Sequence, residues 1–273
     1  MKCIICNGEQ IEYEKNSCLK MPVYFCKICD NFVTGNSEED VKKRLQDLYS
    51  GEYWEERNAK KSIKSNYTDN DSEGKRRNWT SQFLYCKKYL EEKKSILEIG
   101  VGGGQTIFWF DQLNYNVTGI EPDSKNVDLI NKKLKNSQVI KGFIEEIDLK
   151  EKFDVVWMSH VLEHLVRPDI FLKKIKKNLK TDGIFFIEVP SSEHKETLES
   201  SIFKNPHVYH FTKKSLLRLV NSEYDVIACD CFRPAKKIDA VLSKIFSIYP
   251  YYPRILTDCK NGRDLRIILK LKK

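Results

Sequence analysis

Short runs of apolar residues alternate with segments of helical periodicity from about residue 79 to the end of the chain. Five runs bounded by turn residues predict buried strands: SILEIG, NVTGIEPD, QVIKGF (138–143), FDVVWMSH (153–160) and GIFFIEVP (183–190). Between them, the spacing of apolar residues predicts helices, including one over 124–135 and a long amphipathic one over 168–180. Strands that alternate with helices indicate a parallel sheet covered by helices on both faces.

Two further strands are predicted near the end, YDVIACDCF (224–232) and LRIILKLKK (265–273). A tight hairpin would suffice to join them, yet about thirty residues intervene. We expect this insertion, 233–263, to carry a helix and a cluster of tyrosines. Tyr249, Tyr251 and Tyr252 could line an acceptor pocket, form a dimer contact or simply pack the insertion.

The front of the chain contains two C-x-x-C pairs about twenty residues apart, formed by Cys3, Cys6, Cys26 and Cys29. In a protein of a reducing compartment this spacing favours zinc over disulfides. Four thiolates around a tetrahedral ion leave no open position, so the ion would be structural. Cys18 lies between the pairs as a spare. The remaining cysteines show no ligand spacing, and we expect core or surface thiols at Cys86, Cys229, Cys231 and Cys259.

These patterns predict three parts. A zinc ribbon with short strands occupies 1–35. A helical linker or lid occupies 36–78, beginning with a capped helix and an aromatic turn and ending in the polar stretch 61–78. The main domain occupies 79–273.

Composition restricts the class of protein. The 273 residues include 32% charged residues and carry a net charge of +8. Scattered lysines on helical faces indicate a solvated surface, or attraction to an anionic partner such as nucleic acid, a nucleotide-sugar or a membrane surface. No stretch approaches the roughly 20 apolar residues of a membrane span, and the N-terminus lacks the apolar core of a signal peptide. We therefore expect a cytoplasmic protein without a transmembrane segment.

The stretch LEIGVGGGQT (97–106) joins a strand to a helix through a turn that contains Gly100, Gly102 and Gly104. Glycines let the backbone approach a ligand closely, and the carboxylate of Glu121, at the tip of the next strand, can accept hydrogen bonds from ribose hydroxyls. The third glycine of the dinucleotide fingerprint would fall at Gln105, which disfavours a dinucleotide. An acid before the glycines suits a ligand with a positive amino group.

LEIGVGGGQT, GIEPD, FDVVWMSHVLEHL and LKTDGIFFIEVP, in this order and spacing, resemble the class I S-adenosylmethionine (SAM) dependent methyltransferases over about 79–273. The two cysteine pairs followed by LYSGEYWEER resemble a bacterial subgroup with an N-terminal zinc ribbon, whose members often act on sugars or other small metabolites. The resemblance implies an α/β, Rossmann-like sheet of seven strands with an antiparallel last strand.

The resemblance also implies a SAM site. The cofactor-binding residues would be Glu98, Gly100, Val101, Gly102, Gly104, Glu121, Pro122, Phe143, Ile144, Ser159 and Tyr53. Tyr53 and its neighbour Trp54 would close over the cofactor. Many family members carry an acid where Phe143 stands, so stacking and backbone contacts would hold the adenine here.

His160, Glu163 and His164 form an H-x-x-E-H pattern, which also occurs in inverted zinc proteases. The context argues against a protease, because His160 follows a parallel strand at the rim where α/β sheets bind ligands. Three interpretations remain. The polar residues could buttress the loop as LEHL begins the next helix, a histidine could act as a general base, or a catalytic divalent metal could bind.

The metal interpretation rests on a second resemblance. Small-RNA 2′-O-methyltransferases and ubiquinone-pathway O-methyltransferases carry an E-x-x-E-H loop and a later histidine that bind a divalent cation. This chain has His160 where those have the first glutamate, and it supplies His207 and His210 in NPHVYHFT. A histidine in place of a carboxylate would favour a softer metal than Mg²⁺. We expect His207 to face the acceptor.

The leading hypothesis is a SAM-dependent methyltransferase that acts on a sugar, nucleotide-sugar or related small metabolite, with oxygen as the acceptor atom, in surface-glycan or secondary-metabolite biosynthesis. RNA methylation is an alternative, because some rRNA base methyltransferases carry a zinc ribbon and a basic charge. MSHVLEH replaces the Asn/Asp-Pro-Pro-aromatic motif of many base methylators, which makes nucleic acid the less favoured partner. A non-catalytic SAM-binding or zinc-ribbon scaffold would not need the glycine turn. The sequence leaves the oligomeric state open.

Overall fold

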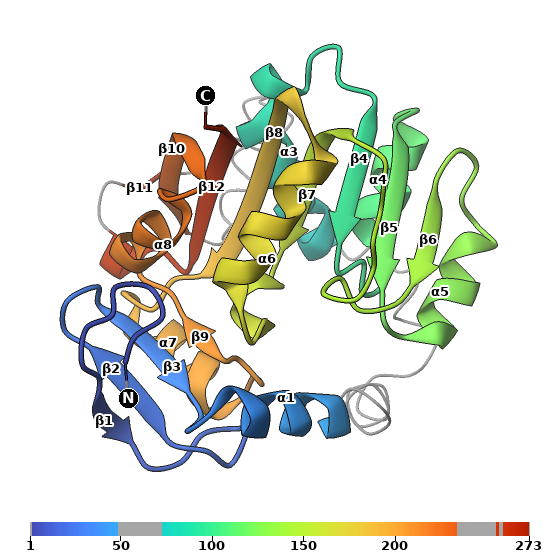
Figure 1. The fold of residues 1–273 in the computed structure, drawn as a ribbon. Helices are drawn as coiled ribbons and strands as arrows, with labels where there is room; N and C mark the ends of the chain where they lie inside the picture. The colour runs from blue at the N-terminus through green and yellow to red at the C-terminus, as the bar shows by residue number, and fades with distance from the viewer. Residues whose placement is uncertain (1, 49–72, 234–254, 257–258, 273) are drawn as a thin grey trace.

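The computed structural model describes residues 2–48, 73–233, 255–256 and 259–272. Two sheets form its framework (Figure 1). The larger has the strand order β11-β10-β12-β8-β7-β4-β5-β6, and the smaller has the order β1-β2-β3-β9. None of the described helices is both long and apolar enough for a membrane crossing.

The large sheet has the predicted topology. Its strands are β4 (Ser95–Ile99), β5 (Asn116–Glu121), β6 (Gln138–Lys141), β7 (Phe153–Ser159), β8 (Leu179–Pro190), β10 (Tyr224–Phe232), β11 (Ile255–Leu256) and β12 (Asp264–Leu271). From β6 to β8 along the sheet, neighbouring strands are parallel, and β12 lies antiparallel between β8 and β10. Apart from the two-residue edge strand β11, this is a seven-stranded sheet with a reversed last strand, so the predicted fold class is confirmed.

Both faces of this sheet are buried, because consecutive strand residues point to opposite sides. Ile96 packs with one core cluster and Leu97 with the other. The first cluster includes residues of α3 (Glu73–Leu90), α4 (Gln105–Gln112) and α5 (Ser124–Asn131). The second includes residues of α6 (Pro168–Ile175) and α8 (Lys213–Val220).

Two helices are shorter than predicted. The helix expected over 124–135 ends at Asn131, because the amides of Lys135 and Asn136 donate to the Asp111 carboxylate at 2.9 and 2.8 Å and turn the chain. The helix expected over 168–180 ends at Ile175 and continues only as the 3₁₀ helix η4 (Lys176–Asn178). There Leu179 already pairs with Phe153, so β8 begins four residues before the predicted strand.

The prediction of unpaired thiols was wrong for one pair of cysteines. Cys231, in β10, and Cys259, in the 3₁₀ helix η5 (Cys259–Asn261), form a disulfide. The strand pairing of β10 with β12 brings the two Cα atoms to 5.3 Å, which is a separation that a disulfide spans. No local pattern in the sequence relates two positions 28 residues apart.

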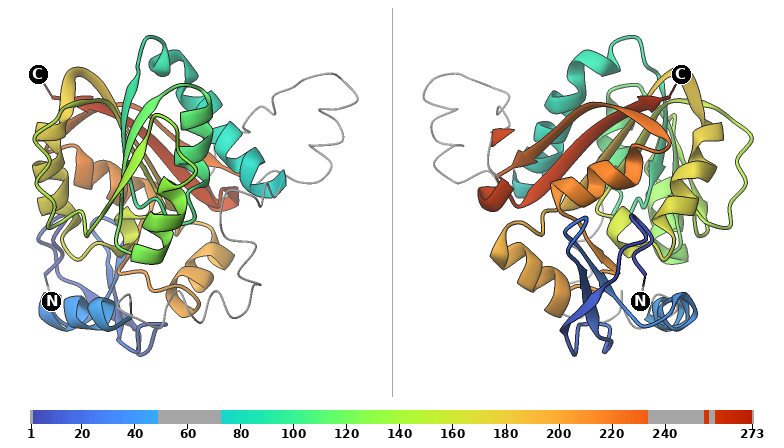
Figure 2. Two further views of the ribbon diagram at one scale, coloured as in Figure 1. Left: turned by 90° about the vertical axis from the view of Figure 1, so that its right-hand side faces the viewer. Right: turned by 60° about the vertical axis from the view of Figure 1, so that its left-hand side comes forward.

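The small sheet joins the N-terminal segment to the main domain. It contains β1 (Ile11–Glu14), β2 (Val23–Cys26) and β3 (Asn31–Thr34), and its fourth strand is β9 (Tyr209–His210). A minor apolar cluster packs Val23 and Phe32 against Ile202 of α7 (Lys195–Phe203). We call residues 2–35, which contain β1, β2 and β3, the N-terminal module. Both views of Figure 2 show this module and α7 at the same end of the molecule. The domain boundaries stay a prediction, but the N-terminal module completes its sheet with a strand from the main domain.

The helix predicted after the cysteine pairs is α1 (Glu38–Asp47), which the Ser37 side chain caps by accepting from the Asp40 amide at 3.1 Å. Most of the expected lid and of the expected insertion lies outside the described residues. This includes Tyr53, Trp54 and the three tyrosines of the insertion, Tyr249, Tyr251 and Tyr252.

Candidate cofactor and acceptor site

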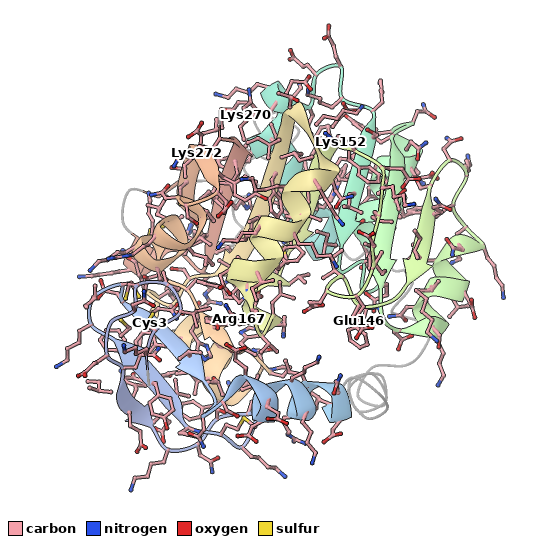
Figure 3. All side chains as sticks on the ribbon, viewed as in Figure 1. Cys3, Glu146, Lys152, Arg167, Lys270 and Lys272 are labelled. Carbon is pink, nitrogen blue, oxygen red and sulfur yellow. A yellow bond between two sulfur atoms is a disulfide. The ribbon has the colours of Figure 1, made fainter. Side chains whose placement is uncertain are left out.

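A cavity of about 1570 Å³ lies at the carboxyl ends of the central strands and extends to α1 and α7. This is the edge at which parallel α/β sheets bind ligands. Two lining residues are labelled in Figure 3, Glu146 after β6 and Arg167 before α6, and Arg167 pairs with Glu38 of α1 at 3.1 Å. The cavity has a glycine-rich end at β4, β5 and β6, and a histidine-rich end at the segment after β7.

At the glycine-rich end, the turn after β4 depends on left-handed backbone conformations. Gly100 has φ +74° and Gly102 has φ +56°. A Cβ on Gly100 would lie 2.3 Å from the Val161 side chain, so packing requires glycine there. A Cβ on Gly102 would meet no described atom within 4 Å, and Gly102 lines the cavity. Glycine at 102 therefore leaves room for a ligand against the backbone.

Glu121 connects this turn to the tip of β5. Its carboxylate, 3% exposed, accepts hydrogen bonds from the amides of Gly102 at 2.7 Å and Asp123 at 3.1 Å. Burial raises the pKa of Glu121 above its ordinary value despite these two bonds. A carboxylate has about four acceptor positions, so Glu121 retains the capacity to accept hydroxyl groups from the cavity.

The predicted cofactor residues divide into two groups. Those that line the cavity are Gly100, Gly102, Glu121, Pro122, Phe143 and Ile144. The other described ones do not line it: Glu98, Val101, Gly104 and Ser159. Glu98 is buried with one carboxyl oxygen unbonded, and burial followed by the charge of Glu121 raises the pKa of Glu98 well above its ordinary value. Ser159 donates to Glu188 at 3.2 Å.

His160 begins the histidine-rich end, at φ +55° just past β7. Its Nε2 lies 3.1 Å from Glu188 and its Nδ1 lies 3.5 Å from Glu163. The carboxylates of Glu163 and Glu188 raise the pKa of His160 well above its ordinary value. His160 is therefore an imidazolium near neutral pH, which can donate a proton or a hydrogen bond but is a poor base.

Glu188 is a site residue that the sequence analysis missed. It is fully buried in β8, where it binds His160 and Arg266 of β12. Burial acts against its charge, but Arg266 and then His160 lower the pKa of Glu188 below its ordinary range. An acid inside the apolar run GIFFIEVP was the signal that could have revealed it, since a buried charge needs a partner.

Glu163, His164 and His207 form a cluster whose potential ligand atoms all lie within 4.8 Å of one another. Glu163 is 1% exposed, and neither carboxyl oxygen has a hydrogen-bond partner within the described part of the chain. His207 Nε2 is 4.0 Å from Glu163, and His164 Nδ1 is bonded to the Pro206 carbonyl at 3.1 Å. A buried carboxyl group facing imidazole nitrogens fits a divalent cation. The LEH segment is a separate 3₁₀ helix, η3 (Leu162–His164), rather than the start of α6.

His210 lies behind His207 and does not line the cavity. It is 1% exposed, and its two ring nitrogens bond the hydroxyls of Ser201 at 2.6 Å and Thr34 at 3.0 Å. The structure thus brings His207 to the histidine-rich end of the cavity and places His210 behind it, connected through the Ser201 hydroxyl. A direct catalytic contact by His210 stays a prediction without support from its position.

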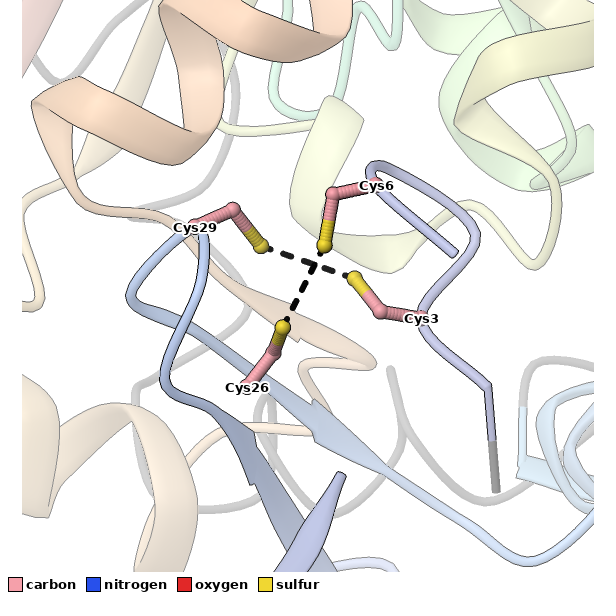
Figure 4. Close-up of side chains that lie close together, drawn as sticks. All are labelled: Cys3, Cys6, Cys26 and Cys29. Atoms are coloured by element: carbon pink, nitrogen blue, oxygen red, sulfur yellow. Dashed lines mark hydrogen bonds between the residues drawn. The ribbon is translucent and has the colours of Figure 1, made fainter. Parts of the chain in front are cut away.

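The four predicted zinc ligands also lie together (Figure 4). Cys3 and Cys29 have Sγ atoms 3.5 Å apart, Cys6 and Cys26 have Sγ atoms 3.3 Å apart, and the four Sγ atoms lie within 4.8 Å of one another. Hydrogen bonding to Cys29 lowers the pKa of Cys3 to about 5, which favours a thiolate. Zn–S bonds of about 2.3 Å in a tetrahedron place sulfurs slightly under 4 Å apart, so the cluster fits such an ion.

The sheet order, the glycine turn after β4 and the buried acid at the tip of β5 together define a class I SAM-dependent methyltransferase fold. Residues 72–224, more than half of the chain, match the family described as "Methyltransferase domain", and the chain belongs to this family. The predicted class is thereby confirmed, whereas membership of the zinc-ribbon subgroup stays a prediction.

Curated relatives include O- and N-methyltransferases. The ubiquinone biosynthesis O-methyltransferase of Pelagibacter ubique is 31% identical over 112 residues, which cover 40% of this chain and 45% of the relative. The enzyme of the same name from Bradyrhizobium diazoefficiens is 28% identical over 37% of this chain and 45% of the relative. A probable (S)-tetrahydroprotoberberine N-methyltransferase of Papaver bracteatum is 26% identical over 40% and 32%. The chain thus matches less than half the length of these relatives.

Solved structures share the fold. A plantazolicin methyltransferase in complex with SAH has a TM-score of 0.57 at 16% identity, covering 85% of this chain and 99% of that chain. A SAM-dependent methyltransferase from Archaeoglobus fulgidus has a TM-score of 0.54 at 16% identity, covering 71% and 94%.

Proposed function

We propose that the protein transfers a methyl group from SAM to a hydroxyl oxygen of a small metabolite, such as a sugar or nucleotide-sugar. The observation that carries the proposal is a single cavity that joins the glycine turn and Glu121 to the cluster of Glu163, His164 and His207. Membership of the methyltransferase family supports the reaction class. The O-methyltransferase relatives favour oxygen as the acceptor atom.

The residues of the glycine-rich end fit SAM. The open space at Gly102 suits close approach of the methionine part, and the Glu121 carboxylate suits the ribose hydroxyls. Phe143, 39% exposed, and Ile144 line the cavity beside Glu121 and suit the adenine. When bound, SAM supplies a sulfonium methyl group, to which the acceptor oxygen forms a bond as the S–CH₃ electron pair returns to sulfur.

At the histidine-rich end, the chain must orient the acceptor and take up the proton of its hydroxyl. His160 is a poor base because Glu163 and Glu188 hold it in the charged form, and since its two N–H groups face these carboxylates, we assign it the role of orienting them. Glu163 lines the same end and is the group we assign to proton uptake when no cation is bound there, whereas His207 faces Glu163 through Nε2. His164 is fixed by its bond to Pro206 and limits the space for the acceptor.

A divalent cation held by Glu163, His164 and His207 would lower the pKa of the acceptor hydroxyl. The chain fits such an ion, since the Glu163 carboxyl group is buried and makes no hydrogen bond among the described residues, and its ion pair with His160 is long, at 3.5 Å. One carboxylate and two imidazoles favour Mn²⁺, Fe²⁺ or Zn²⁺ over Mg²⁺. We infer in addition that the four clustered cysteines hold a structural zinc ion, supported by their mutual distances.

The test is calorimetric titration of S-adenosylhomocysteine, the reaction product, into the purified zinc-loaded protein. We expect micromolar binding that is lost in Glu121→Ala and retained in Glu91→Ala, which changes an exposed acid at the end of α3. Thermal unfolding of each variant separates lost binding from lost folding. Absence of binding by the wild-type protein would refute the proposed methyl transfer.

A further inference from the structure

A chain of buried hydrogen bonds runs from the acceptor end of the cavity into the N-terminal module. His207, whose Nε2 faces Glu163, is bonded through Nδ1 to the Ser201 hydroxyl at 2.7 Å. The same hydroxyl is bonded to His210 Nδ1 at 2.6 Å, and His210 Nε2 is bonded to the Thr34 hydroxyl at 3.0 Å. These four residues are at most 8% exposed, so water does not compete for the bonds.

The Ser201 hydroxyl couples the two rings, because it has one hydrogen and meets two Nδ1 atoms. It must donate to one ring and accept from the other. If His207 carries its proton on Nε2, Ser201 donates to His207 and accepts from Nδ1–H of His210, and Thr34 donates to His210 Nε2. If His207 carries its proton on Nδ1, all three bonds run the other way. The tautomers of His207 and His210 are therefore linked.

Without a cation, the first direction is favoured. It points an Nε2–H group of His207 towards the buried carboxyl group of Glu163, which has no hydrogen-bond partner among the described residues. It also uses the hydrogen of both hydroxyls. His210 is 1% exposed and both of its ring nitrogens face hydroxyl groups, a setting that suits a neutral ring with a single ring proton.

A cation on Nε2 of His207 requires that nitrogen to be without a proton. We propose that Thr34, His210 and Ser201 are positioning residues that set the tautomer of His207. A divalent cation on His207 Nε2 would then reverse the donor and acceptor roles in all three hydrogen bonds that connect these residues. The inference rests on the proposed acceptor site. It makes the N-terminal module part of the apparatus that prepares His207.

The backbone follows the same route as the side chains. The Thr34 amide donates to the Val208 carbonyl at 2.7 Å, and the Val208 amide donates to the Glu163 carbonyl at 2.8 Å. The pairing of β3 with β9 sets the adjacent residues in register, Phe32 opposite His210. The N-terminal module is therefore connected to Glu163 by backbone hydrogen bonds and to His207 by the side-chain hydrogen bonds. Both residues are members of the candidate cation cluster.

Nuclear magnetic resonance on protein labelled with ¹⁵N at its five histidines reads each tautomer directly. Before further metal is added to protein loaded at the cysteines, we expect Nε2–H on His207 and Nδ1–H on His210. A second equivalent of Zn²⁺ should move both protons, to Nδ1 of His207 and Nε2 of His210. In Ser201→Ala, His207 should still respond to Zn²⁺ and His210 should no longer follow.

Thr34→Val removes the terminal hydroxyl with little change in shape. We expect Zn²⁺ affinity at the second site to fall about tenfold, as for lost partners of metal-bound histidines. Thr118→Val is the control. It changes a buried threonine of β5 that is not one of the four hydrogen-bonded residues, and it should leave the Zn²⁺ affinity unchanged. The proposal is overturned if His207 responds to Zn²⁺ in the wild type while His210 does not, or if Zn²⁺ leaves His207 unchanged.

S-adenosylhomocysteine binding, measured on the same samples, separates the two proposals. Retained binding together with uncoupled histidines would overturn the hydrogen-bond chain alone. Absent binding in the wild type would overturn the proposed function whatever the tautomers show.

Discussion

Mild acid should destabilise the protein through His210, and asparagine at this position should remove that part of the effect. His210 is 1% exposed and lies between two hydroxyl groups that serve a neutral ring. Burial, followed by the charge of His164, lowers the pKa of His210 to about 3. A histidine in an unfolded chain has a pKa of about 6.5.

Between these two pKa values the unfolded chain binds a proton that the folded chain excludes. The free energy of unfolding therefore falls as the pH falls below about 6.5, and the loss continues until about pH 3. At pH 5, which lies about 1.5 units below the unfolded pKa, the loss from this one ring is about 2 kcal/mol at 1.36 kcal/mol per unit. The full stability is present only above the pKa of the unfolded chain, because folding lowers the pKa of this histidine.

The measurement is urea unfolding followed by circular dichroism at pH 7 and pH 5, for the wild type and His210→Asn. The variant is less stable than the wild type at pH 7 because it loses hydrogen bonds. Between pH 7 and pH 5, however, its free energy of unfolding should fall by about 2 kcal/mol less than that of the wild type. Other titrating groups, including the cysteine cluster, are common to both proteins and cancel in the difference. Equal losses in the two proteins would show that folded His210 accepts a proton, and the reasoning would fail.

Three further predictions concern the site and the residues that support it. Gly102→Ala should lower stability by only about 1 kcal/mol but weaken S-adenosylhomocysteine binding at least about tenfold, whereas Gly100→Ala should lower stability by about 3 kcal/mol because its Cβ overlaps a side chain. Identical stability losses in urea unfolding would contradict this distinction. Arg266→Met should cost about 3 kcal/mol by removing one of the two cationic partners of buried Glu188 and leaving only His160, and adding Glu188→Leu should restore part of it in a double-mutant cycle. Cys26→Ser should remove bound zinc and lower the melting temperature; a zinc-free variant with wild-type melting would argue against a structural ion.

The central sheet was predictable because its signals are local. Strands buried on both faces are continuous apolar runs, as in SILEI and FDVVWMS, and the glycine turn marks where β4 ends. Element ends were less predictable, because distant partners set them. The Asp111 carboxylate accepts hydrogen bonds from two backbone amides after α5, and these bonds end the helix earlier than predicted.

The sequence brought the candidate residues to notice but not their pairings. H-x-x-E-H at the end of a strand predicted an acceptor site, which stays a prediction, and the structure brings Glu163, His164 and His207 together at the histidine-rich end of the cavity. The two-residue strand β9 carries no periodicity, and only its pairing with β3 makes it a strand. The ion pair of His160 with Glu188 and the Cys231–Cys259 disulfide likewise depend on strand neighbours that no single segment encodes.

The pairing of β3 with β9 has a consequence for the order of events during protein synthesis. Thr34 leaves the ribosome 176 positions before His210, which at about 5–20 residues per second corresponds to roughly 10–35 s. During that interval the outer edge of β3 has no partner strand, and exposed edges promote association with other chains. The nascent module must therefore hold itself together with two hairpins and its cysteines. If the four clustered cysteines hold zinc as proposed, zinc supply during synthesis would affect how much of the chain reaches its native state.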